Sequence, residues 1–222
     1  MTSTVAMSDT TTASNPTSDW RPHAMTGMAY GAFIMGFFGC LWLVWGLAAM
    51  EARTAVVVSA AIAFAASLWV PATSLLRSAS RAVRAASPLG RGDRLEQARM
   101  GKVFGLIFGA EGLLIFLVVN VLNNIGLRDY GISAIAAIVG LHFLPLARLY
   151  RRPMYTVVGI IMTLAALASI ALPSSMRISV LASTMAAIVW VTCVLVVRGG
   201  FAMGRAVQTP AEVHIGKSPY RQ

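Results

Sequence analysis

Apolar residues gather in six long runs along the chain, and short polar segments separate them. The runs cover residues 26–50, 54–76, 103–123, 130–147, 154–172 and 178–197. Each is about 20 residues long, the length that an α-helix needs to cross the hydrocarbon core of a bilayer. The pattern therefore predicts an all-α, polytopic membrane protein, a bundle of about six transmembrane helices.

The polar segments set the predicted domain limits. Residues 1–25 are rich in Ser and Thr and lack the apolar content to fold alone, so we expect a flexible tail. Residues 26–200 form the transmembrane domain, and its longest connection, 77–101, is basic. Residues 201–222 are predicted to be a C-terminal tail.

Composition and charge support this class and orient it. Hydrophobic residues make up 57% of the chain and charged residues 12%, about half the charged fraction of a soluble domain. The net charge of +10 does not indicate a nucleic-acid binder, because the basic residues lie between the apolar runs. Of the 18 lysines and arginines, only Arg53, Arg128 and Arg177 fall on one side of the predicted bundle.

The positive-inside rule then places both termini and the 77–101 connection in the cytoplasm. We expect a multi-pass protein of a bacterial cytoplasmic membrane. The basic connection has two interpretations: its charges set the topology, which we favour, or they also recruit anionic lipid or an acidic partner.

The third run, 103–123, has two distinct faces at 100° per residue. Gly105, Gly109, Gly112 and Asn120 share one sector, and glycines allow close helix packing in lipid while Asn can hydrogen-bond across helices. Glu111 lies on another face. We therefore predict that this helix occupies the centre of the bundle and packs through its glycines.

Two prolines fall inside apolar runs. Pro71 lies near the end of the second run and Pro145 near the end of the fourth. Each removes a backbone donor, so we predict a kink at each position, with neighbouring groups or Thr73 and Ser74 satisfying the carbonyl that Pro71 frees.

Glu111 and His142 are the ionisable residues that lie deep in apolar runs, and such residues are functional candidates by default. Counted from the turn near Leu127, Glu111 is about 16 residues away and His142 about 15. At 1.5 Å per residue the two lie at nearly the same depth on antiparallel neighbours. The sequence predicts that they meet.

Function is less clearly indicated. No nucleophile with a base and no metal-ligand spacing is present, so the pattern argues against an enzyme and predicts no catalytic, metal or cofactor residues and no cofactor. We expect a small proton- or solute-coupled carrier with Glu111, His142 and Asn120 at its site, its substrate unidentified. The alternative is a non-catalytic scaffold or regulator of a partner protein. Beyond the bilayer, the small bundle favours a homo-oligomer and no nucleic-acid partner.

Overall fold

The part of the chain that the structure describes folds into six α-helices and one short 3₁₀-helix. The structure is a computed structural model, and it describes residues 21–85 and 91–208. The helices are α1 (Arg21–Ala49), α2 (Thr54–Ala85), α3 (Arg91–Asn124), η1 (Arg128–Tyr130), α4 (Gly131–Tyr150), α5 (Pro153–Ser169) and α6 (Ser174–Gln208). The predicted all-α bundle is confirmed.

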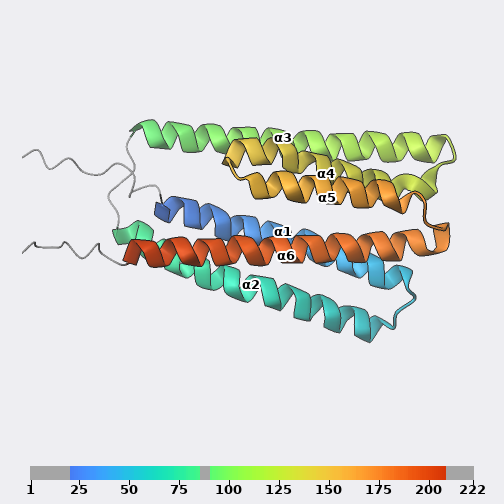
Figure 1. Ribbon diagram of the computed structural model, residues 1–222, viewed down its shortest axis with the longest axis horizontal. Coiled ribbons are helices and arrows are strands. Elements are labelled where there is room, and N and C mark those ends of the chain that lie inside the picture. The colour runs from blue at the N-terminus through green and yellow to red at the C-terminus, as the bar shows by residue number, and fades with distance from the viewer. Residues whose placement is uncertain (1–20, 86–90, 209–222) are drawn as a thin grey trace, which may run out of the picture.

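Five of the helices are long and apolar enough to cross a membrane. The sixth, α5, has 17 residues, or about 26 Å, at the short end of what can span the hydrocarbon core. The chain is therefore a multi-pass integral membrane protein. The start of α1 and the end of α6 lie at the same end of the molecule (Figure 1).

Three helices continue well past the predicted membrane limits. α2 runs nine residues beyond 76, α3 begins before 103, and α6 extends to Gln208. The segment 201–208 is thus helical and not part of a tail, whereas residues 1–20 and 209–222 lie outside the described residues. These extensions are rich in Ala and Arg, which favour helix even where no apolar stripe needs burying.

The helices form two groups of three. α1 packs between α2 and α6, and α4 packs between α3 and α5 (Figure 1). A shared core joins the groups, with Trp42 from α1, Phe143 from α4, Met162 from α5 and Met185 from α6. Each of these four side chains is at most 6% exposed.

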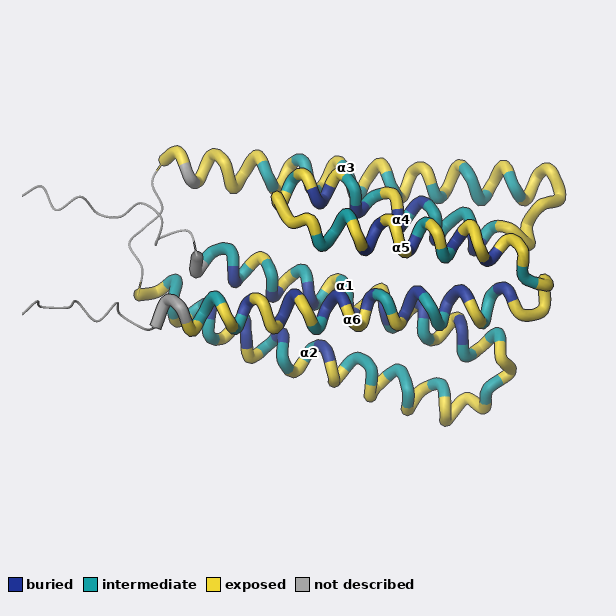
Figure 2. The backbone as a smooth tube through the Cα atoms, in the orientation of Figure 1, coloured by how far each residue is buried: buried dark blue, intermediate teal, exposed yellow. Residues whose placement is uncertain are grey.

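Contrary to our prediction, α3 lies at the edge of the bundle. It packs mainly against α4, and exposed residues run along its length (Figure 2). Gly105, Gly109 and Gly112 are exposed, and a Cβ atom added to any of them would meet nothing within 4 Å. The prediction of glycine packing on α3 is wrong within the chain, because a helix with one main neighbour buries one face, and here that face carries Glu111.

The close glycine contact joins α4 and α5 instead. A Cβ atom on Gly159 would lie 2.7 Å from the carbonyl oxygen of Gly140. Nearby, the hydroxyls of Ser133 and Ser169 are buried and lie 2.8 Å apart. Small residues therefore bring these two backbones together, as expected for helices in lipid.

Neither proline interrupts its helix. Pro71 lies within α2 and Pro145 within α4, and both helices continue past them. The hydroxyls of Thr73 and Ser74 donate to the carbonyl of Val70, at 2.7 and 3.1 Å. That is not the carbonyl of Ser67, which Pro71 deprives of its amide partner, so this part of the prediction is wrong.

Candidate functional site

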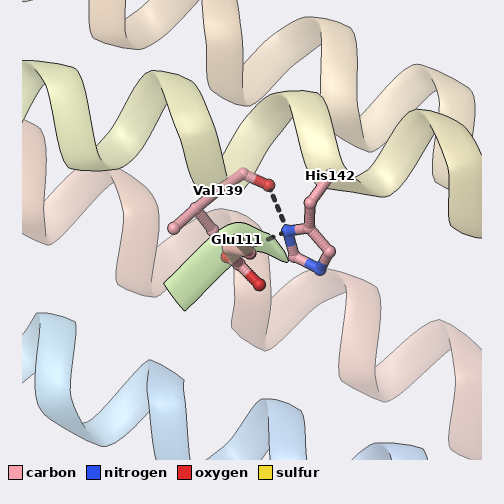
Figure 3. A network of polar contacts seen from close by, with 3 residues as sticks. All are labelled: Glu111, Val139 and His142. Carbon is pink, nitrogen blue, oxygen red and sulfur yellow. Dashed lines mark hydrogen bonds and ion pairs between the residues drawn. The ribbon is translucent and has the colours of Figure 1, made fainter. Parts of the chain in front are cut away.

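Glu111 of α3 and His142 of α4 meet inside the bundle. Nδ1 of His142 lies 3.2 Å from Oε1 of Glu111, and the side chains are 11% and 9% exposed respectively (Figure 3). The predicted contact between them is confirmed. It results from two antiparallel helices joined by a short turn, which places residues equally far from the turn at equal depth.

The contacts of Nδ1 show which nitrogen of the neutral imidazole ring carries the hydrogen. Nδ1 also lies 2.6 Å from the backbone carbonyl oxygen of Val139, one helical turn earlier on α4 (Figure 3). A carbonyl oxygen can only accept, so Nδ1 carries the hydrogen and donates it. The Glu111 oxygen on the same nitrogen then also accepts, as a carboxylate does. This leaves Nε2 as the ring atom that gains or loses a proton.

Aromatic rings surround the pair. The ring of Phe143 lies 4.5 Å from that of His142, centroid to centroid, and the ring of Phe108 stands edge-on at 5.8 Å. Phe38 of α1 contacts Phe108 at 6.0 Å, so a helix of the other group also reaches this site.

Further aromatic rings extend from the pair toward the C-terminal end of α4. Phe104 lies 5.2 Å from Phe108 and 6.5 Å from Tyr150, and Tyr155 lies 6.1 Å from both Phe143 and Tyr150. We call these six residues the aromatic cluster: Phe38, Phe104, Phe108, Phe143, Tyr150 and Tyr155. The cluster makes the surroundings of the pair apolar, which raises the cost of any net charge there.

Asn120 does not belong to the site. Its side chain is exposed, and Nδ2 donates to the carbonyl of Phe116 on its own helix at 2.7 Å. It lies about nine residues, or about 13 Å, along α3 from Glu111. The prediction that it hydrogen-bonds across helices is wrong, because the α3 face that carries it has no helix neighbour within the described part of the chain.

The site offers no metal-binding group. Among the described residues there is no group of three or more His, Cys, Asp or Glu side chains that could hold a metal ion. Two surface hollows occur elsewhere, one on α2 around Trp69 and one on α6 around Ala202. Neither is lined by Glu111 or His142. A carboxyl and an imidazole are both groups that can exchange protons.

A second buried charge, Arg177, was not predicted. Its side chain is 6% exposed, and its guanidinium lies 4.4 Å from the centroid of the Tyr130 ring. Its nitrogens donate to the carbonyls of Ser169, Leu172 and Asp129 at 3.2, 3.0 and 3.2 Å. A fourth bond reaches the carbonyl of Ile170 at 3.4 Å.

Arg177 therefore closes the C-terminal end of α5 and links it to η1 and α6. The available signal was its position, four residues after Pro173 and one turn into α6, from which an arginine can reach the last carbonyls of the preceding helix. From the sequence, Arg177 counted only as a basic residue between two apolar runs, so its bonds to the end of α5 were not predicted.

Comparisons with known proteins give a family and no activity. No curated protein and no solved structure matches the chain significantly. One family model matches residues 23–199, which reach from the first turn of α1 through most of α6 and include both Glu111 and His142. The chain belongs to this family, which is described as a family of unknown function, DUF7010.

Proposed function

We propose that the chain is a small proton-coupled carrier and that the Glu111–His142 pair is its proton site. The observation that carries the proposal is the 3.2 Å contact between the two side chains within the aromatic cluster. Ionisable groups in such surroundings are rare, and in pumps and transporters they commonly relay protons. The proposal places the protein in a bacterial cytoplasmic membrane.

The net charge of the Glu111–His142 pair would couple proton release to solute binding. With a proton on Nε2, the imidazolium and the Glu111 carboxylate sum to zero. Loss of that proton leaves one negative charge, which the aromatic cluster does not offset and water reaches poorly. A positively charged solute that enters as the proton leaves restores neutrality, so proton release and solute binding favour one another.

Helix α3 is the element that moves in this proposal. It packs mainly on α4, and the turn at residues 125–127 joins its C-terminal end to η1 and α4. Separation of α3 from α4 would open the Glu111–His142 contact to a solute. Helices α1, α4, α5 and α6 share the buried core and stay together.

Proton flux in liposomes tests the proposal. The purified protein is reconstituted with a pH-sensitive dye inside, and a panel of cationic metabolites and metal ions is added outside. We expect at least one cation to drive proton movement in the parent, and Glu111→Gln and His142→Gln to abolish it. The matched control is Glu96→Gln, which removes an exposed carboxylate from the same helix and should leave the flux unchanged.

A direct measurement of the histidine makes the test independent of the panel. Nitrogen NMR of histidine-labelled protein reports the proton on Nε2, and the His142 signal is identified by its loss in His142→Gln. The proposal requires that Nε2 exchange its proton with the solvent as pH is varied. A His142 ring that keeps one protonation state across the range in which the protein is folded would reject it.

The second candidate function is a scaffold, and the exposed face of α3 favours it. Leu106, Leu113 and Phe116 on this helix are 60% or more exposed, so the helix offers a long apolar surface to lipid or to another chain, including a second copy. A Glu111–His142 pair that exchanges no proton, together with stable co-purification of a partner protein, would support the scaffold function.

A further inference from the structure

The surroundings of the Glu111–His142 pair are those in which aromatic rings help to hold a cation. The ring centres of Phe143 and Phe108 lie 4.5 and 5.8 Å from that of His142. A cation is attracted to the face of an aromatic ring whose centre is within about 6 Å. On the other helix the Glu111 carboxylate lies 3.2 Å from the imidazole. With a proton on Nε2, the imidazolium is therefore a cation that contacts one carboxylate and two aromatic rings.

The same surroundings offer little to a metal ion. Helices α1, α4 and α5 contain no Asp or Glu within their described bounds, so they add no carboxylate to that of Glu111. The carbonyl oxygen of Val139 already accepts from His142. Mg²⁺ and Ca²⁺ need about six or more oxygen ligands, and a hydrated ion loses its water at high cost in an apolar site. The chemistry of the site therefore favours an organic cation, whose charge is diffuse and weakly hydrated.

Phe38 connects this site to the bilayer. It lies on α1 and contacts Phe108 at 6.0 Å across the boundary between the two groups of helices. Phe38 is 40% exposed within the membrane-crossing part of α1, so its exposed side faces lipid. A cation with apolar groups, dissolved in the bilayer, can follow these rings to His142 when α3 moves. At the other end of the aromatic cluster, Arg151 follows Tyr150, and its positive charge opposes entry of a cation there.

We propose that the site binds a lipophilic organic cation, such as a quaternary ammonium ion that carries an aromatic ring. This inference rests on the proposed function and names the class of its solute. The proton leaves Nε2 for water, and the Glu111 carboxylate then balances the charge of the bound cation. Binding does not require that Glu111 be without a partner, because the neutral imidazole still donates to it from Nδ1.

Equilibrium binding tests this inference on the full-length protein. The protein is purified in neutral detergent and incubated with radiolabelled benzyltrimethylammonium, and we expect saturable binding. Neopentylbenzene has the same shape, with a carbon atom in place of the charged nitrogen. It should compete about tenfold more weakly than unlabelled benzyltrimethylammonium, because it lacks the attraction of the carboxylate and the rings for a charge. Sodium and magnesium ions at the same concentration should not compete.

Substitutions at the rings separate cation binding from general apolar contact. Phe108→Leu keeps an apolar side chain and removes the ring, so it should weaken binding by about fivefold. Phe108→Tyr keeps a ring and should retain most of the binding, which guards against misfolding. The matched control is Phe116→Leu, which changes an exposed phenylalanine on the same helix outside the aromatic cluster and should leave binding unchanged. Glu111→Gln should abolish binding.

Two results would overturn the inference. One is equal competition by neopentylbenzene and benzyltrimethylammonium in the parent, which would mean that the charge is not recognised. The other is an equal loss of binding in Phe108→Leu and Phe116→Leu.

Nitrogen NMR of His142 distinguishes these failures from failure of the proposed function. If Nε2 exchanges its proton and benzyltrimethylammonium does not bind, the organic cation is rejected and the proton site stands. If benzyltrimethylammonium binds through Glu111 and Phe108 while His142 keeps one protonation state, the cation site is supported and the proton-coupled carrier is rejected.

Discussion

Buried charges in this molecule are satisfied in two different ways. Glu111 has an ionisable partner on another helix, whereas Arg177 donates to backbone carbonyls and lies over one aromatic ring. A charge-paired site changes when either partner gains or loses a proton, while an arginine stays charged at all relevant pH values. The first arrangement suits a site that exchanges protons, and the second suits a fixed joint.

The Glu111–His142 contact predicts energetic coupling between the two residues. Glu111→Gln and His142→Gln should each lower the free energy of unfolding, and the double variant should cost less than the sum, with a coupling of about 0.5–3 kcal/mol. Once one partner is gone, removal of the other no longer breaks the contact between the two side chains. Unfolding in mixed detergent provides the measurement, and strictly additive effects would show that the two side chains do not interact.

Arg177 predicts a large loss of stability on substitution. Arg177→Gln removes most of the bonds that close the end of α5, so we expect a loss of about 3 kcal/mol and a lower melting temperature. Arg128→Gln is the matched control, because Arg128 is an exposed arginine at the same end of the molecule. Equal melting of the two variants would mean that the Arg177 bonds contribute little.

The depth of a side chain along its helix could be predicted from the sequence. The helices that lie beside that side chain could not. Counting residues from a turn gives height along a helix, which is why the Glu111–His142 contact was found. The direction that Asn120 faces and the carbonyls that Arg177 reaches depend on which helices lie beside them. No residue count carries that information.

At the scale of helices, α3 has two faces that could each be packed against a neighbour, the face with its glycines and the face with Glu111. Its glycines and Asn120 predicted a central helix, but α4 covers the face with Glu111 and leaves the glycines exposed. Burying a carboxyl away from lipid and pairing it saves more free energy than close glycine packing, whose gain is small dispersion contacts. The sequence pattern identified both faces of α3, but it could not predict which of them would be buried against another helix.

The glycines of α4 and α5 predict where added volume is harmful. Gly159→Ala places a Cβ atom 2.7 Å from the carbonyl oxygen of Gly140, so the helices must separate at a cost of about 1–3 kcal/mol. Gly109→Ala meets no atom within 4 Å and should leave stability unchanged or slightly higher, since Ala favours helix.

Thermal unfolding of the two glycine variants in detergent separates these cases. A marked loss in Gly109→Ala together with none in Gly159→Ala would show that α3 packs through its glycines after all. In that case a second copy of the chain is the first neighbour to look for, and the apparent mass of the complex would be measured next.

For the whole molecule, the basic residues define a boundary that several helices share. Arg128 and Arg148 are about 20 residues apart across α4, or about 30 Å, and Arg177 and Arg198 are about 21 residues apart across α6. Both separations match the hydrocarbon core. The number of helices could be predicted, because the hydrocarbon core requires a similar length of apolar sequence from each helix that crosses it. The division into two groups of three could not, because lipid sets no preference among apolar neighbours.

This boundary predicts the sidedness of the chain. In a variant without Cys40 and Cys193, a cysteine at Arg84 should react with a membrane-impermeant reagent only from the cytoplasm, and one at Arg53 only from outside. Both residues lie beyond the hydrophobic part of α2, at its two ends, and both are exposed, unlike Arg177, whose burial makes it unsuitable for labelling. Because α2 crosses the membrane once, labelling of both cysteines from one side would place the two ends of α2 together and contradict the six-helix topology. Labelling of each cysteine from the opposite side would keep the fold and reverse the orientation that the positive-inside rule assigns.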